Sequence, residues 1–305
     1  MGLTTRLALS VVAAAWLSAP VVARANPYDI SVRGLGRPAT NSLTDPAVLR
    51  YRALTSELAL SLAPRPLAPA ETLGLSGFEF SLVSTLAGIS SGEAYWQGQP
   101  GSPIIEGALP SHGSRAVPSA LWVPSLHVRK GLPFSTEIGI NGSYLAFSEM
   151  VNAGVEAKVA LHESYFRYAP ALSFRAAGSR LFGATDFGMI TVEGDAMTSL
   201  AFGVGGMAQV TPYAGYGLMY AQIDHTVIDE TPYKVLDAND QQGGPSGSLY
   251  SFPTLDWNEN QHSRIFGGLR INVAMLELLY EFDFGMVGFN KKQLISHSFK
   301  LGLDV

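Results

Sequence analysis

The sequence predicts an all-β protein, an antiparallel up-and-down transmembrane β-barrel of about ten strands (twelve is the alternative) that follows a short N-terminal helical segment. Three observations lead to this fold class. Apolar and polar residues alternate over long stretches, and the connections between these stretches are long and short in turn. The chain is also apolar on average, with a mean hydropathy of +0.17, yet no run after the N-terminus is long enough for a membrane helix.

The N-terminus has the layout of a secretory signal peptide, so we expect residues 1–25 to be removed. Arg6 provides a positive start, residues 7–16 form a compact apolar run, and Ala23-Arg24-Ala25 is an A-x-A cleavage pattern. The apolar run is shorter than the roughly 20 residues that span a bilayer. A retained signal anchor is the alternative. The chain has no cysteine, which excludes a lipid-anchored lipoprotein.

Residues 26–71 form a separate N-terminal segment with a predicted helix near 46–62. Asp45 suits the N-cap and Pro46 the first helical position, and prolines at 64 and 66 end the helical pattern. A helix is about 10 Å across, and the side chains of an eight-stranded barrel already fill its interior. We therefore expect a ten-stranded barrel to hold this helix poorly. A position in the periplasm or at the barrel mouth is favoured, and a plug is the alternative.

Residues 72–305 are predicted to form the barrel. In Val151–His162, apolar residues occupy every second position, and Asn152, Glu156, Lys158 and His162 lie opposite. Successive side chains of a strand point to opposite faces, so this segment has one apolar and one polar wall. Comparable stretches give the ten predicted strands, at 77–82, 120–130, 134–147, 151–162, 170–181, 187–199, 207–223, 264–273, 276–284 and 298–305.

The length of the strands and the alternation of long and short connections both favour a membrane barrel over a soluble one. Most stretches reach or exceed the roughly 9–11 residues that a membrane-spanning strand needs. A lipocalin-like barrel would carry its charges outside and its apolar residues inside, which is the alternative. The long connections, 88–119 and 225–262, are the first and the seventh, whereas the second is the tight Gly131-Leu132-Pro133. Long external loops and short periplasmic turns are typical of the outer membrane, so we expect outer-membrane lipid and the barrel-assembly machinery as partners.

A weak resemblance lies in the segment Ser31–Arg37, which reads S-V-R-G-L-G-R. This segment is similar to the start of the long-chain fatty-acid transporter (FadL-type) family, whose members open with S-x-x-G-L-G-R. The resemblance implies a hatch inside a barrel and a transport function, but it covers under a tenth of the mature chain, and that family has a larger barrel. The remainder resembles outer-membrane β-barrel proteins of unassigned function.

The polar wall of the predicted strands carries many charges, and we expect them to line the lumen. Two interpretations remain open: an ion-pair network that fills the lumen, because buried charges need partners, or the lining of a selective pore. The predicted lumen-lining residues are Glu79, His127, Arg129, Glu137, Glu156, Lys158, Arg175, Glu193, Asp195, Arg264, Arg270, Glu277, Glu281, Asp283 and Lys300.

The two long loops contain Tyr95, Trp96 and Trp257, which are predicted as external-loop contacts. They would touch a partner, a glycan or a substrate, or they would pack the loops over the barrel mouth. Both interpretations stay open.

We expect no enzymatic activity. His162-Glu163-Ser164 matches the H-x-S pattern of lipid A deacylases, but the predicted topology puts it at the periplasmic end, whereas that chemistry occurs towards the outer leaflet. Asp224-His225 lies at an external rim, as the catalytic Asp and His of omptin proteases do, but it lacks their D-x-H spacing.

Cofactors, metals and nucleic acid are not expected. Six dispersed histidines without cysteine give no metal-ligand spacing. Without Arg6 and Arg24, 18 of the 20 basic residues face 25 acidic ones, a net charge of −7, which does not suit nucleic acid. The favoured function is a narrow channel or transporter for small solutes, which include hydrophobic ones. The alternative is a non-conducting structural or surface-recognition barrel that acts through its long loops.

Overall fold

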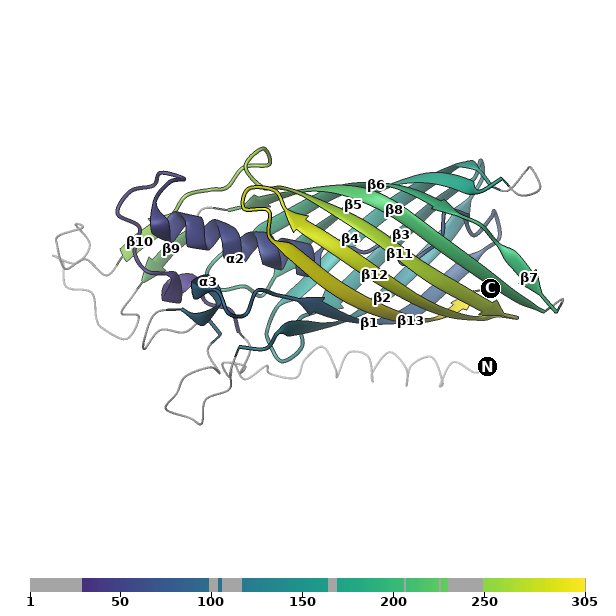
Figure 1. The fold of residues 1–305 in the computed structure, drawn as a ribbon, viewed down its shortest axis with the longest axis horizontal. Helices are drawn as coiled ribbons and strands as arrows, with labels where there is room; N and C mark the ends of the chain where they lie inside the picture. Colours follow the sequence, from purple (N-terminus) through teal and green to yellow (C-terminus); the bar gives the residue numbers. More distant parts are fainter. Residues whose placement is uncertain are drawn as a thin grey trace, which may run out of the picture.

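The computed structural model describes residues 29–98, 104–105, 117–163, 169–205, 207–224, 226–229 and 249–304. The predicted signal peptide and parts of both long loops lie outside these ranges. Within them, ten strands form one closed antiparallel barrel in which each strand pairs with its neighbours along the chain (Figure 1). The strands are β1 (Phe78–Gly88), β2 (Ala120–Leu132), β3 (Thr136–Tyr144), β4 (Val151–His162), β5 (Ala171–Phe182), β6 (Met189–Ser199), β8 (Ala208–Ile223), β11 (Gln261–Val273), β12 (Leu276–Val287) and β13 (Gln293–Asp304).

The barrel closes between its first and last strands, where Leu82 of β1 lies opposite Leu301 of β13. This confirms the predicted fold class and the strand number. Three further short strands lie outside the barrel wall proper. They are β7 (Phe202–Val204), which pairs with β8, and β9 (Thr226–Asp229) and β10 (Leu249–Phe252), which form a separate hairpin.

The alternation in the sequence separates the two faces of the wall. In β1, Glu79, Ser81 and Thr85 point inward and are buried, whereas Phe80 and Leu82 point outward and are exposed. Because the strand repeat is two residues, a polar inner wall and an apolar outer wall follow directly from the pattern.

The two ends of the barrel differ. One end, the turn end, carries the β2–β3 and β11–β12 connections and the end of β13. The opposite end, the loop end, carries the β1–β2 and β8–β11 connections, the hairpin β9–β10 and the short helix α3 (Ala94–Gln97) (Figure 1). The turns at the turn end are tight enough that Phe134, Ser135 and Ala274 adopt left-handed backbone conformations.

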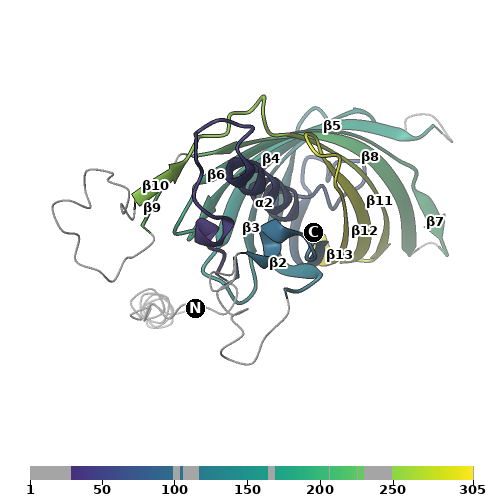
Figure 2. The same cartoon turned by 60° about the vertical axis from the view of Figure 1, so that its left-hand side comes forward.

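The N-terminal segment begins at the loop end and reaches the turn end through the lumen (Figures 1 and 2). We call residues 29–62 the cap; they contain the 3-10 helix η1 (Val32–Leu35) and the helix α2 (Pro46–Leu62). Asp45 caps α2, since its side chain accepts a hydrogen bond from the Ala47 N–H at 2.9 Å. Residues 63–77, the lumen segment, then lead to β1.

The helix α2 lies at the mouth of the barrel at the loop end, which is one of the two favoured positions, and the lumen segment that follows it runs inside the barrel. The part that passes through the lumen is extended chain, which is narrower than a helix and fits beside the inward-pointing side chains. No helix in the described ranges is both long and apolar enough to cross a membrane.

Candidate functional site

The lumen is the candidate functional site, and its centre is the backbone of Leu67. The Leu67 carbonyl oxygen accepts hydrogen bonds from Nη2 of Arg129 and from Nζ of Lys300, each at 2.8 Å. The Leu67 N–H donates to Oε2 of Glu281 at 3.1 Å. Leu67 is buried and has a φ of 44°, in the left-handed region that a leucine rarely adopts. The wall therefore holds the main chain of this residue at three points.

Other cations of the wall bind the main chain along the lumen segment. Nη2 of Arg264 donates to the Pro64 carbonyl at 2.8 Å, and Nζ of Lys158 donates to the Pro69 carbonyl at 3.3 Å. Proline has a carbonyl acceptor but no N–H donor. The prolines thus match a lumen that offers many cationic donors to the segment.

The turn-end half of the lumen contains one group of ion pairs. Arg129 contacts Glu79 at 3.1 Å, Glu137 at 3.6 Å and Glu156 at 3.8 Å. Lys300 lies 2.6 Å from both Glu79 and Glu277, and Lys158 lies 3.3 Å from Glu137. These charges are buried, so each needs partners of opposite sign, and the group supplies them mutually.

A second group adjoins the first through Glu156. Arg175 contacts Glu156 at 2.7 Å and Asp195 at 2.5 Å. Arg264 contacts Glu193 at 2.5 Å and Asp283 at 3.6 Å. The lumen segment joins this group directly, since Nη1 of its Arg65 lies 3.3 Å from Oδ2 of Asp283.

All fifteen predicted lumen-lining residues belong to barrel strands whose alternate side chains are buried inside the barrel. Thirteen of them belong to these ion pairs or to the pair of Arg270 with Glu71 at 3.3 Å. His127 instead contacts the Ser125 hydroxyl at 3.3 Å, and Glu281 accepts hydrogen bonds from Leu67 and from the Tyr213 hydroxyl.

Sequence reasoning missed the residues that the lumen segment contributes, above all Arg65 and Glu71. In the sequence alone, the prolines that flank Arg65 indicate only the end of a helix. The local sequence around Arg65 holds no signal that separates a buried extended segment from an exposed linker.

The loop end is closed by contacts between the cap and the first long loop. Glu57 of α2 is fully buried and accepts hydrogen bonds from the Tyr95 hydroxyl and from Nε1 of Trp96, both at 2.7 Å, and from the Ser90 N–H at 3.0 Å. Burial, together with the hydrogen bond to Glu57, raises the pKa of Tyr95 above its ordinary value.

These contacts place Tyr95 and Trp96 against the cap, which agrees with the second of the two interpretations, in which the loop packs over the barrel mouth, and not with exposed contacts for a partner. Tyr95 is 7% exposed and Trp96 is 0% exposed, because a buried carboxylate needs donors and these two side chains supply them. Trp257, the third predicted contact, is half-buried.

The two enzyme-like motifs do not form a described catalytic pair. Glu163 beside His162 is bound by the Thr72 N–H at 2.8 Å and by the Ser135 hydroxyl at 2.9 Å. Ser164 and His225, the other halves of the two motifs, lie outside the described residues. Within the described part of the chain, no three His, Asp or Glu side chains group as metal ligands would.

Comparisons with known proteins return no family model and no curated protein that matches the chain. Among solved structures, Ail of Yersinia pestis is 9% identical, with a TM-score of 0.28, over 76% of this chain and 99% of that one. Neisserial surface protein A is 10% identical, with a TM-score of 0.27, over 75% of this chain and 95% of that one. Omp33 of Acinetobacter baumannii is 9% identical, with a TM-score of 0.27, over 75% of this chain and 97% of that one. Similarities this low support no functional conclusion, and the long-chain fatty-acid transporter resemblance gains no support.

Proposed function

We propose that the protein is an outer-membrane barrel whose lumen is sealed by its own N-terminal segment and which acts as a surface-recognition protein through its loop end. The observation that carries this proposal is the lumen segment itself, whose Leu67 is held by Arg129, Lys300 and Glu281 inside the ring of strands. A solute would meet this segment before it could cross.

The outer wall supports the membrane location. Each of the ten barrel strands presents a large apolar or aromatic side chain outward, and these form a continuous belt. In chain order they are Leu82, Leu126, Ile140, Val155, Phe174, Val192, Tyr216, Ile265, Tyr280 and Phe299, all exposed. Apolar surface of this extent is unusual in soluble monomers, and a closed barrel leaves no unpaired strand edge in lipid. The long connections favour the loop end as the external one.

The test of the sealed lumen is electrical conductance in planar bilayers. We expect the intact mature protein to give no steady conductance and a version without residues 26–71 to give discrete open steps. The mature chain has no cysteine, so a matched control can be built by introducing two of them. Ala70 and Ser199 are suitable positions, because the Ala70 N–H donates a hydrogen bond to Oγ of Ser199 at 3.1 Å. Steady conductance from the oxidised, cross-linked double variant would contradict the sealed lumen.

A second candidate function is a narrow channel for small solutes that opens when the cap and the lumen segment withdraw. It is favoured by the kind of contact that holds the lumen segment inside the barrel. These contacts are hydrogen bonds from wall side chains to main-chain carbonyls of the segment, which can break and form again. Without the segment the wall would keep eight predicted lumen carboxylates and six lysines and arginines, a net charge of −2. An opened barrel of this kind should prefer cations. Conductance that appears only in the reduced form of the double-cysteine variant, with cation preference, would favour this function over the first.

A further inference from the structure

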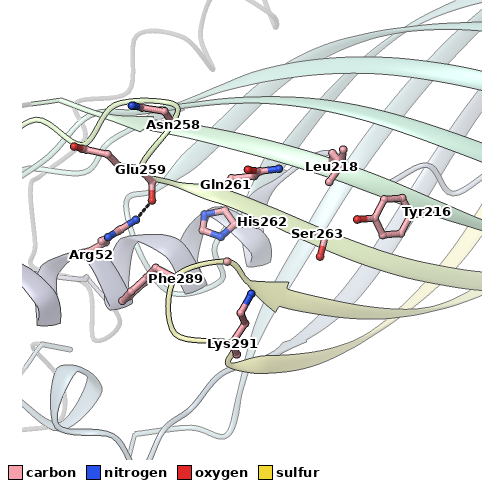
Figure 3. Close-up of a pocket in the computed structure, with 11 residues that line it drawn as sticks. Arg52, Tyr216, Leu218, Asn258, Glu259, Gln261, His262, Ser263, Phe289 and Lys291 are labelled. Carbon is pink, nitrogen blue, oxygen red and sulfur yellow. Dashed lines mark hydrogen bonds between the residues drawn. The ribbon is translucent and has the colours of Figure 1, made fainter.

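A cavity of about 400 Å³ lies at the rim of the loop end (Figure 3). We call it the rim pocket. It lies where α2, strands β8 and β11 and the β12–β13 connection meet, and the residues used below are Arg52, Tyr216, Leu218, His262, Phe289 and Lys291. None of the functions considered above assigns a role to this cavity.

The rim pocket contains buried polar atoms that lack a partner. His262 is 1% exposed, and neither of its ring nitrogens has a hydrogen-bond partner within the described part of the chain. The same is true of Nε of Arg52. Buried polar groups are almost always hydrogen-bonded. A polar group that enters the cavity would supply the partner that these atoms lack.

The charges around the cavity favour an anion. Arg52 is held in place, because one of its Nη atoms donates to the Glu259 carbonyl and its guanidinium lies 4.4 Å from the centre of the Phe289 ring. Lys291 adds a second cation from the β12–β13 connection. The Glu259 carboxylate accepts from the Asp256 N–H at 3.1 Å and points away from His262 (Figure 3). An arginine, a lysine and an imidazole together suit a phosphate group.

The position of the cavity indicates the source of that phosphate. Its lining includes Tyr216 and Leu218 of β8, and Tyr216 belongs to the apolar outer belt. The cavity therefore joins the polar rim to the surface that would face lipid. We propose that the rim pocket binds the phosphate of a membrane amphiphile, whose acyl chains lie along the belt beside Tyr216. The lipid source rests on the membrane location proposed above, whereas the phosphate chemistry does not.

The test is isothermal titration calorimetry on the full mature protein in an uncharged detergent and a phosphate-free buffer. The probes are dihexanoyl phosphatidylglycerol, glycerol 3-phosphate and inorganic phosphate. The variants are Arg52→Gln, His262→Phe and Lys291→Gln, of which Lys291→Gln changes an exposed side chain and leaves packing intact. Arg180→Gln is the matched control, since Arg180 is an exposed arginine near the loop-end terminus of β5 and does not line the rim pocket.

We expect one lipid to bind per protein, with at least roughly tenfold weaker binding for each pocket variant, because each variant loses a hydrogen bond or a charge contact with the phosphate. Binding by Arg180→Gln should equal that of the unchanged protein. Weaker binding of glycerol 3-phosphate than of the lipid supports the amphiphile. Equal binding of the two phosphate esters assigns the same site to a soluble phosphate and overturns the lipid source.

Failure of all three probes to bind, or equal binding by the folded pocket variants, overturns the proposal. Heat-dependent migration in gels establishes that each variant is folded. Because the titration does not depend on whether the lumen conducts, its failure is distinguishable from failure of the proposed sealed barrel.

Discussion

The Glu57 carboxylate of α2 accepts a hydrogen bond from Nε1 of Trp96 at 2.7 Å, although the two residues lie on opposite sides of the first barrel strand in the chain. This contact joins the cap to the first long loop across the mouth of the barrel. The closure of the loop end therefore depends on a buried charge and its donors as well as on apolar packing.

Replacing Glu57 with alanine should release the cap. The change leaves the Tyr95 hydroxyl, the Trp96 indole N–H and the Ser90 N–H without their acceptor, and each unsatisfied buried donor costs about 1–3 kcal/mol. We expect faster proteolysis of residues 29–62 in the folded protein, measured by mass spectrometry of the fragments. Glu93→Gln is the control, because Glu93 pairs with Lys292 on the exposed surface and should change little. Equal proteolysis of both variants would argue against the role of Glu57.

Replacing Arg129 with methionine should destabilise the barrel and its lumen segment together. Arg129 contacts three glutamates and the Leu67 carbonyl, and removing one partner of a buried ion pair typically costs about 3–5 kcal/mol. The midpoint of urea unfolding, followed by tryptophan fluorescence, should fall clearly. Arg180→Gln, which removes an exposed arginine from the outer wall, should leave the midpoint unchanged. A similar midpoint for Arg129→Met and the unchanged protein would contradict the network.

Replacing Gly131 with alanine should displace the end of the lumen segment. A Cβ at Gly131 would lie 1.8 Å from the Gly74 carbonyl oxygen, so the backbone of one of them must move. We expect a lower thermal midpoint and faster hydrogen exchange at residues 72–77. Gly142→Ala is matched to it, since a Cβ there meets no atom within 4 Å. The prediction fails if the two alanine variants exchange at the same rate.

High pH should loosen the cap. Burial, with Asp224 and Asp186 nearby, raises the pKa of Tyr51, and burial with Glu57 nearby raises that of Tyr95. Both tyrosines stay protonated in the capped state, whereas in a detached cap they ionise near pH 10. Capping is therefore fully favoured below about pH 10 and weakens as the pH rises towards the raised values. The part of the tyrosinate absorbance that disappears in a Tyr51→Phe, Tyr95→Phe double variant should rise together with proteolysis of the cap, and its appearance near pH 10 with the cap still protected would contradict this.

The barrel wall was predictable because its signal is local. In Val151–His162 the two-residue repeat assigns each side chain to one face of the sheet. Charges such as Glu156 and Lys158 could therefore be placed inside the barrel before any strand pairing was known. Strand ends were less accurate. β1 continues to Gly88, beyond the predicted 77–82, because small residues such as Ala87 carry no facing signal.

The lumen segment was not predictable in the same way. Its contacts link residues far apart in the chain, such as Leu67 with Lys300, and they use main-chain carbonyls that every residue has. Nothing in the local pattern of Pro64, Arg65 and Pro66 distinguishes a buried extended chain from an exposed linker. The burial of Trp96 has the same origin, because it depends on Glu57, which precedes β1.

The path of the N-terminal segment constrains the order in which the molecule is built. The cap lies at the loop end of the barrel and the chain enters β1 at the turn end, so residues 63–77 cross the full length of the lumen. If β1 and β13 paired first, the 17-residue helix α2 would have to pass through a lumen that is filled with arginine and glutamate side chains. The simpler order is that the strands wrap around a segment already in place and the seam between first and last strands closes afterwards. The position of the N-terminal segment inside the barrel thus implies an order of folding, in which the segment is placed before β1 and β13 pair.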